Sequence, residues 1–150
     1  MKKEIKNSME IKFKAIAENE AFARNVVASF ILPLNPSVNE LEDIKTAVNE
    51  AVTNVIVHAY PDKKGDIEIS AEICDNEVYI TVTDYGVGIP DIEKAREPFY
   101  TTNPTKERSG MGFTVMEGFM DKVIIESTKG MGTSITLIKR FGDVEVAIGG

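Results

Sequence analysis

Apolar and polar residues alternate with a period of two in five segments of the chain, which predicts five β-strands. The segments run from Met9 to Ala15, from Ile67 to Ile73, from Val78 to Val82, from Val123 to Ser127 and from Thr133 to Lys139. Asp75-Asn76 separates the second segment from the third, and Gly130-Met131-Gly132 separates the last two. These residue types tolerate positive φ and form tight turns. We therefore expect a first strand and, after it, two β-hairpins.

Three other segments carry apolar residues at helical spacing and predict α-helices. They run from Asn19, as the N-cap, to about Leu32, from Ser37 to about Ala59, and from Gly110 to Met120. The first should bury Phe22, Val26, Val27, Phe30 and Ile31 on one face. The second opens with Ser37-Val38-Asn39-Glu40, which fits a capping box, and its stripe consists of Leu41, Ile44, Val48, Ala51, Val52 and Val55.

The order of these elements predicts the class of fold. Strands come in hairpins rather than in strict strand–helix alternation, which favours an α+β protein. We expect a two-layer sandwich in which helices cover one face of a mixed, mainly antiparallel sheet. The 150 residues suit one compact domain. Polar residues with two prolines fill the stretch 91–109, which is typical of a mobile flap.

Charge and composition exclude several classes of protein. The net charge of −7 disfavours direct nucleic-acid binding, because nucleic-acid binders usually carry a basic excess or stripe. No apolar run reaches the ~18–20 residues that span a bilayer, and the N-terminus has no signal-peptide core. We therefore expect a cytoplasmic protein without membrane contact. The single cysteine, Cys74, lies in a predicted strand and is expected to be a buried, inert thiol.

Glu50 and Asn54 lie four residues apart on the longest helix and therefore share one of its faces. A carboxylate and an amide oxygen on one helix are suitable ligands for Mg²⁺, which takes its other ligands from water and nucleotide phosphates. By itself the pair is weak evidence, because such a pair on a helix is most often a solvated surface. His58, the one histidine, lies near the end of the same helix and is expected to be structural or close to the nucleotide.

Two glycine-rich segments follow in the chain. Asp84-Tyr85-Gly86-Val87-Gly88 comes directly after a predicted strand, where glycines let the backbone approach a flat ligand and the aspartate can accept from an exocyclic amine. Arg108-Ser109-Gly110-Met111-Gly112 opens a predicted helix, whose first N–H groups form an anion site. Alone, each segment is also compatible with an ordinary turn or hinge. The chain contains neither a P-loop nor a complete dinucleotide fingerprint.

Together the three motifs resemble the ATP-binding fold of DNA gyrase, the large heat-shock chaperones, histidine kinases and mismatch-repair ATPases. The helix motif is similar to the N-box of that fold, the two glycine segments to its glycine boxes, residues 95–109 to its lid, and Gly132-Thr133 to its late Gly-Thr. Longer stretches more closely resemble the anti-sigma F factors of spore-forming bacteria, from about Met9 to Lys139. They read Asn19-Glu20-Ala21-Phe22-Ala23-Arg24, Asn49-Glu50-Ala51-Val52-Thr53-Asn54, Pro98-Phe99-Tyr100-Thr101-Thr102 and Glu107-Arg108-Ser109-Gly110-Met111-Gly112-Phe113.

The resemblance implies a serine-protein kinase that uses Mg·ATP, with ADP as product, to phosphorylate a small anti-anti-sigma protein. It also implies that the protein holds a sporulation sigma factor inactive as an ATP-bound homodimer. Glu50 would be the general base, Arg108 would act at the γ-phosphate, and Asn54 would bind Mg²⁺. The other nucleotide-binding residues would be Asp84, Gly86, Gly88, Thr101, Thr102, Ser109, Gly110, Met111, Gly112 and Thr133. Arg24 would lie on the surface that meets the protein partners.

Three alternatives keep the same pocket. One is a related kinase that controls a stress-response sigma factor. Another is a nucleotide-gated binding module without phosphotransfer, which would have no need of a base at Glu50. The third is a detached histidine-kinase catalytic domain, which would require a partner chain carrying the phosphorylated histidine. The residues after Arg140 show no resemblance that assigns them a role.

Overall fold

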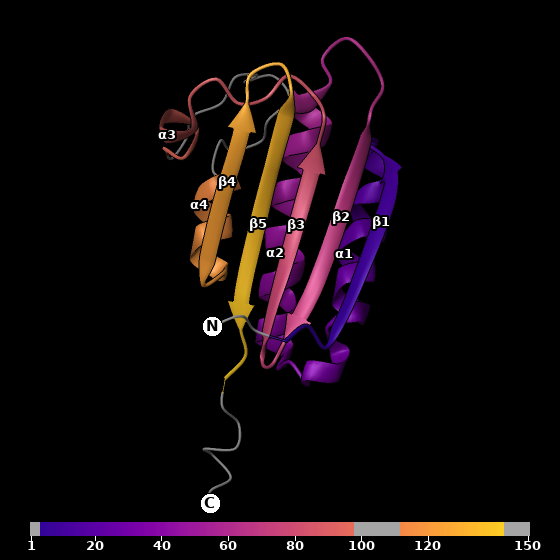
Figure 1. Ribbon diagram of the computed structural model, residues 1–150, viewed down its shortest axis with the longest axis vertical. Helices are drawn as coiled ribbons and strands as arrows, with labels where there is room; N and C mark the ends of the chain where they lie inside the picture. Colours follow the sequence, from indigo (N-terminus) through magenta and orange to yellow (C-terminus); the bar gives the residue numbers. More distant parts are fainter. Residues whose placement is uncertain (1–3, 98–111, 143–150) are drawn as a thin grey trace, which may run out of the picture.

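The computed structural model describes residues 4–97 and 112–142 of the chain. Its strands are β1 (Asn7–Lys14), β2 (Asp66–Cys74), β3 (Glu77–Asp84), β4 (Lys122–Thr128) and β5 (Gly132–Arg140). Its helices are α1 (Glu20–Phe30), α2 (Val38–Asn54), α3 (Ile92–Ala95) and α4 (Gly112–Phe119), with 3₁₀ turns η1 (Ala17–Asn19) and η2 (Leu32–Leu34) and a π turn η3 (Val55–Ala59). Figure 1 shows one sheet with the helices behind it.

The strands form one sheet in the order β1-β2-β3-β5-β4. The α+β class with helices on one face is therefore confirmed. Each of the four pairings is antiparallel, so the expectation of a mixed sheet was wrong for the described strands. After β3 the chain crosses to the edge of the sheet, where it forms β4. Strand β5 then runs between β3 and β4 and pairs antiparallel with both. This crossover places Asp84 of β3 opposite Thr133 of β5.

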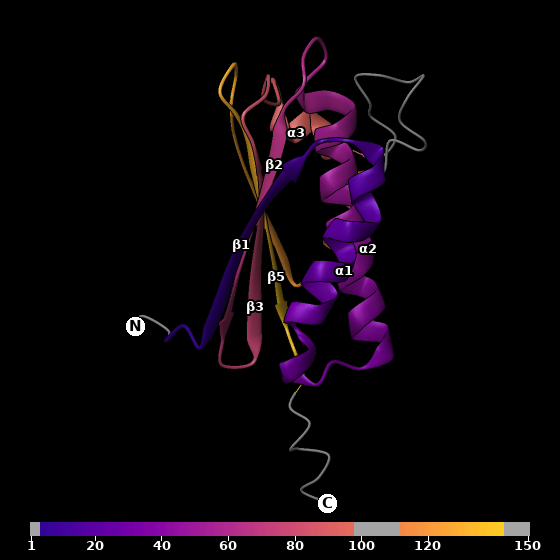
Figure 2. The same ribbon diagram turned by 90° about the vertical axis from the view of Figure 1, so that its right-hand side faces the viewer.

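Helices α1 and α2 lie against one face of the sheet, as the side view in Figure 2 shows. The strand side chains that they bury are the apolar half of the alternation: Ile67, Ile69, Ala71, Val78, Ile80, Val82, Ile135 and Leu137. Each large aliphatic side chain buried in this way contributes about 1.5–3 kcal/mol. The opposite face is polar, and there the hydroxyl oxygens of Thr81 and Thr136 lie 3.1 Å apart. Among the described residues no helix is long and apolar enough to cross a membrane.

Helix α2 begins with the predicted capping box. The Ser37 hydroxyl accepts from the Glu40 N–H at 3.0 Å, and the Glu40 carboxylate accepts from the Ser37 N–H at 2.8 Å. The helix presses the fully buried Ile44, Ala47, Val48, Ala51 and Val52 against the sheet. After Asn54 it widens into the π turn η3, a feature that is often found at functional sites.

Helix α1 departs from its prediction in two details. Asn19 occupies the N-cap position, but its side chain donates to the Lys14 carbonyl at 2.9 Å and makes no cap hydrogen bond. Phe22 is 47% exposed and meets Phe13 edge to face, with ring centroids 5.6 Å apart. Of the other residues expected on the buried face, Val27 and Ile31 are buried and Val26 and Phe30 are half-buried. Ala23 is buried in place of Phe22, whose ring packs on the edge strand β1.

The polar stretch after β3 begins with a short helix that was not predicted. The Asp91 side chain caps α3 by accepting from the Lys94 N–H at 3.1 Å. Arg96 then forms an ion pair with Glu117 of α4 at 2.7 Å, which ties the start of this stretch to the helix layer. The rest of the expected lid lies outside the described residues. At the other end of the chain Phe141 is buried in the core.

Candidate functional site

The motifs predicted from the sequence gather at one end of the sheet. In Figure 1 this is the upper end, where β3 and β4 finish, β5 begins and the polypeptide leaves the π turn that follows α2. The sheet order causes this, because β5 pairs with β3 on one side and with β4 on the other. The elements that carry the predicted residues therefore meet at one end of the sheet.

Glu50, Asn54 and Gly112 meet where α4 begins against α2. A Cβ atom at Gly112 would lie 3.4 Å from the Glu50 carboxylate and 3.5 Å from both the Asn54 amide nitrogen and oxygen. An added Cβ would meet both side chains at ordinary van der Waals distance, so the glycine leaves that space open to a ligand. The structure thus brings the first and the last of the three sequence motifs into contact, although 61 residues separate Glu50 and Gly112 in the chain.

The Asn54 side chain fits a polar ligand. Its amide nitrogen is buried and has no hydrogen-bond partner in the part of the chain that the structure describes. Buried polar atoms are nearly always paired, so an orphan at the edge of a site indicates a group supplied by a ligand. The amide oxygen next to it is the kind of donor that Mg²⁺ takes in proteins. The donor set therefore fits Mg²⁺ bound jointly by Asn54 and nucleotide phosphates.

Replacing Asn54 with alanine is expected to weaken Mg-dependent ATP binding by about 10- to 100-fold, the cost of one strong polar contact. Titration calorimetry with ATP, in magnesium and then in excess chelator, measures this. Chelation should reduce the affinity of the natural protein far more than that of the variant. Asn39→Ala, an exposed position on the same helix, is the matched control. Equal ATP affinity of the Asn54 variant and the natural protein in magnesium would contradict the metal site.

Asp84 ends β3 with its side chain on the helix-covered side of the sheet, where it is only 5% exposed. Its carboxylate accepts from the Gly86 N–H at 2.9 Å. Burial raises the pKa of Asp84 above its usual value, and hydrogen bonds from the Gly86 and Thr133 N–H groups oppose part of that rise. The small exposed part of this carboxylate is suited to accept a hydrogen bond from a bound polar group.

The first glycine segment passes closely over the end of the π turn η3. A Cβ at Gly86 would lie 2.0 Å from the Ala59 carbonyl oxygen, and the Val87 N–H donates to that same oxygen at 2.9 Å. Gly88 has a φ of +80°, and a Cβ there would lie 2.5 Å from the Thr128 carbonyl oxygen. Both glycines are thus required by the backbone approach itself, as the sequence pattern indicated.

Thr133, which was predicted, lies in a small hydroxyl cluster with Ser127, which the sequence analysis did not identify. Its hydroxyl lies 2.9 Å from that of Ser127, and the Ser127 hydroxyl accepts from the Ile89 N–H at 2.7 Å. Ser127 therefore links the loop after β3 to the start of β5. The available signal was the final hairpin, since a turn at Gly130-Met131-Gly132 places the residues on either side of it opposite one another.

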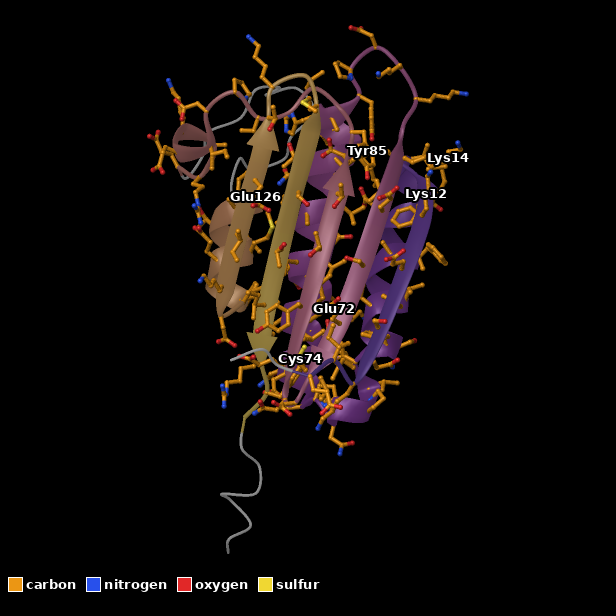
Figure 3. All side chains as sticks on the ribbon, viewed as in Figure 1. Lys12, Lys14, Glu72, Cys74, Tyr85 and Glu126 are labelled. Carbon is orange, nitrogen blue, oxygen red and sulfur yellow. The ribbon has the colours of Figure 1, made fainter. Side chains whose placement is uncertain are left out.

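Tyr60 is a second residue that the sequence analysis did not identify. Its hydroxyl contacts the backbone at the start of β2 and just after β3. The sequence feature that could have identified it is its place at the end of the helical segment with Glu50 and Asn54, directly before Pro61. Tyr85, in contrast, lies on the other face of the sheet, where its hydroxyl donates to Glu68 at 2.9 Å (Figure 3). Its ring is therefore directed away from Asp84.

Arg24 lies apart from these residues, on the outer surface of the helix layer. Its guanidinium donates to the Asn49 side chain at 2.9 Å. The groove around it, between α1 and α2, is lined by Glu20, Arg24, Glu42, Lys45, Thr46 and Asn49. This surface carries charges of both signs, and Asn49 directly precedes Glu50 in the chain. The remaining predicted site residues, Thr101, Thr102, Arg108, Ser109, Gly110 and Met111, lie outside the described residues.

Sequence comparison finds one family whose model covers most of the chain. The model of the histidine kinase-like ATPase domain matches residues 13–139. A protein of Clostridium acetobutylicum named anti-sigma F factor is 55% identical over 141 residues, which are 94% of this chain and 99% of that protein. Proteins of the same name from Bacillus licheniformis and Geobacillus stearothermophilus are each 54% identical, over 90% and 91% of this chain and 93% and 94% of their own lengths.

Solved structures show a similar fold at lower identity. The RsbU and RsbW domains of a Mycobacterium tuberculosis protein superpose with a TM-score of 0.66 at 20% identity, over 90% of this chain and 32% of that one. The catalytic domain of the histidine kinase ThkA superposes with a TM-score of 0.56 at 18% identity, over 89% of this chain and 96% of that one. These two similarities establish the fold.

Proposed function

The chain belongs to the histidine kinase-like ATPase domain family and, within it, to the anti-sigma F factors, and from this premise we propose its function. It binds Mg·ATP, transfers the γ-phosphoryl group to a serine of a small anti-anti-sigma protein, and holds a sporulation sigma factor inactive as a homodimer. The observation that carries the catalytic part is the contact between Gly112 and the Glu50–Asn54 pair. It gathers a carboxylate, a metal ligand and the first described turn of a helix in one place.

The proposed reaction needs positioning and charge neutralisation more than covalent help from the protein. The Glu50 carboxylate takes the proton of the serine hydroxyl. The serine oxygen then forms a bond to the γ-phosphorus, the bond from that phosphorus to the β–γ bridging oxygen breaks, and ADP leaves. Asn54 would hold Mg²⁺, which when bound neutralises phosphate charge. Gly112 leaves room for phosphate oxygens, and we assign Arg108 to the γ-phosphate.

At the other end of the nucleotide, we assign Asp84 to the exocyclic amine of adenine. Its carboxylate is buried and is oriented by the Gly86 N–H. A site that hydrogen-bonds a substrate amine discriminates strongly against a ligand without one, because the buried acceptor is then unpaired. Gly86 and Gly88 supply a backbone that the flat base can approach, and Thr133 adds a hydroxyl that Ser127 orients.

The function is tested with purified protein, labelled ATP, Mg²⁺ and a small anti-anti-sigma protein from the same genome. Label on a serine of that protein would support the kinase function. Tight ATP binding without transfer would leave a nucleotide-gated binding module. Transfer of label to a histidine of another chain would favour the detached histidine-kinase domain. Co-purification with purified sporulation and stress-response sigma factors then separates the two kinds of anti-sigma protein.

Replacing Arg24 with alanine is expected to weaken binding of the protein partners by about 10- to 100-fold, because buried arginines at interfaces often dominate the binding energy. The affinity for ATP should not change, since Arg24 donates to Asn49 in a groove whose lining includes neither Glu50 nor Asn54. Interferometry with an immobilised sigma factor and anti-anti-sigma protein measures the first effect, and calorimetry the second. Arg140→Ala, at an exposed position on β5, is the matched control. If both variants bind the partners as tightly as the natural protein, the assignment is wrong.

A further inference from the structure

Tyr60 occupies an unusual place between two strands. It is the first residue after the π turn, and its hydroxyl donates to the Asp66 carbonyl at 2.7 Å while accepting from the Tyr85 N–H at 2.9 Å. Asp66 is the first residue of β2, and Tyr85 is the first residue after β3. One hydroxyl group therefore satisfies a backbone carbonyl and a backbone N–H from two different segments.

The register of the sheet shows what this hydroxyl replaces. Ile67 of β2 pairs with Asp84 of β3, so Asp66 and Tyr85 are the residues that would form the next antiparallel pair. The Tyr60 hydroxyl stands between their backbone groups and takes the place of a direct bond between them. The two strands consequently separate at the residue after Asp84, and the chain is free to turn out of the sheet.

The chain that leaves the sheet here is held a second time by the neighbour of Tyr60. The Ala59 carbonyl accepts from the Val87 N–H at 2.9 Å, and Gly86 is pressed so closely against it that no Cβ fits. Two consecutive residues where the π turn ends, Ala59 and Tyr60, thus anchor Val87 and Tyr85, respectively. Gly86, between these two anchors, donates to the Asp84 carboxylate. The orientation of that carboxylate therefore depends on how the segment is anchored.

The ring of Tyr60 is fixed by its own surroundings. A Cβ at Gly65 would lie 2.2–2.4 Å from three carbon atoms of the ring, so the ring packs directly on the glycine backbone. A side chain at position 65 would displace the ring and carry the hydroxyl away from both partners. The glycine is therefore part of the same arrangement.

We propose that Tyr60 is a positioning residue for the adenine base. It ends the β2–β3 pairing after Asp84, and it thereby determines the position of the base-binding segment 85–89 and the orientation of the Asp84 carboxylate. This rests on the proposed binding of ATP. The Tyr60 hydroxyl bonds to the backbone of Asp66 and Tyr85, whereas the proposed phosphate-end residues Glu50 and Asn54 belong to α2. Its loss should therefore act on the affinity for adenine nucleotides and not on the phosphotransfer step.

Tyr60→Phe keeps the ring and removes only the hydroxyl. The expected result is an affinity for ATP and for ADP that is lower by about 10-fold, measured by calorimetry well below the melting temperature. In the kinase assay the KM for ATP rises by a similar factor, and kcat at saturating ATP is unchanged. Tyr79→Phe is the matched control, because it also removes a tyrosine hydroxyl bond, to Glu77 at 3.1 Å, on the polar face of the sheet.

Equal ATP affinity of Tyr60→Phe and the natural protein would overturn the proposal, and so would an equal loss in Tyr79→Phe. A lower melting temperature with unchanged affinity would also overturn it. If the natural protein binds no adenine nucleotide, the proposed function itself has failed. Hydrogen exchange of the natural protein without nucleotide is a test that needs no variant: the Tyr85 amide should exchange at least about 10-fold more slowly than that of Lys63 in the exposed turn. Equally rapid exchange would show that the hydroxyl bond is absent.

Gly65→Ala provides a second variant, in which Tyr60 keeps its hydroxyl group. It should displace the ring and lower ATP affinity in the same way, although its direct effect is only one added methyl group. A combination of Gly65→Ala with Tyr60→Phe should then be no worse for ATP binding than either change alone, because both act through the same contact. Additive losses would contradict that shared mechanism.

Discussion

Replacing Glu50 with glutamine should abolish phosphotransfer while ATP remains bound. Glutamine preserves the size and the polarity of the side chain beside Gly112, but its amide cannot take a proton from a serine hydroxyl. General-base catalysis typically contributes about 10²- to 10⁴-fold to a rate, and we expect a loss of that size. Single-turnover transfer of label to the anti-anti-sigma protein measures it, and the ATP dissociation constant should stay within about 3-fold.

Two comparisons make this result specific to Glu50. Glu72→Gln, on the polar face of the sheet in Figure 3, changes the same functional group and should transfer normally. Binding of the sigma factor should also survive in Glu50→Gln, because the lining of the proposed partner groove around Arg24 does not include Glu50. Normal transfer by Glu50→Gln would reject the role as base. A loss of ATP binding equal to the loss of transfer would make Glu50 a binding residue instead.

Replacing Asp84 with asparagine is expected to weaken ATP binding by about 10- to 100-fold, the cost of a charge-assisted hydrogen bond in a buried site. The asparagine oxygen can still accept from the Gly86 N–H, as the carboxylate does. Its amide group then points an N–H to the place where, in the proposed function, the adenine amine needs an acceptor. Calorimetry with ATP measures the loss, and Asp62→Asn in the exposed turn is the control.

The same substitution should not destabilise the nucleotide-free protein at neutral pH. Burial raises the pKa of Asp84 above 3.8 in the folded state, so the folded protein holds this proton more tightly than the unfolded chain does. The stabilisation from the protonated form is complete below the unfolded pKa and is lost as the pH rises through the folded pKa. At neutral pH the buried charge is therefore a cost that asparagine removes.

Melting curves at several pH values test this linkage. At neutral pH the melting temperature of Asp84→Asn should equal or exceed that of the natural protein. The difference should shrink as the pH falls through the folded pKa of Asp84 towards 3.8, because the natural side chain then also becomes neutral. A variant that is clearly less stable at neutral pH would show that the carboxylate contributes to the fold as well as to the site.

Local patterns predicted much of the fold. The period-two segments and the turn residues located the strands, and Asp75 has the positive φ of 53° that its turn requires. Ser37 and Glu40 cap α2 as their spacing indicated. These features are decided by neighbours within a few residues, so the sequence carries them directly. Where the prediction for α1 failed, a group on the preceding strand β1 was the cause: the Asn19 side chain donates to the Lys14 carbonyl, and the ring of Phe22 packs against that of Phe13.

The candidate site divides in the same way. The sequence by itself determined that Glu50 and Asn54 share a helix face and that Asp84 and its glycines follow a strand, because these relations depend on periodicity alone. Only the tertiary structure decided that Gly112 lies against the pair, that the Ile89 N–H donates to Ser127, and that the Tyr85 N–H donates to Tyr60. The physical reason is that these contacts join segments far apart in the chain. They exist because β5 inserts between β3 and β4 and the helices pack on one face, which no local pattern specifies.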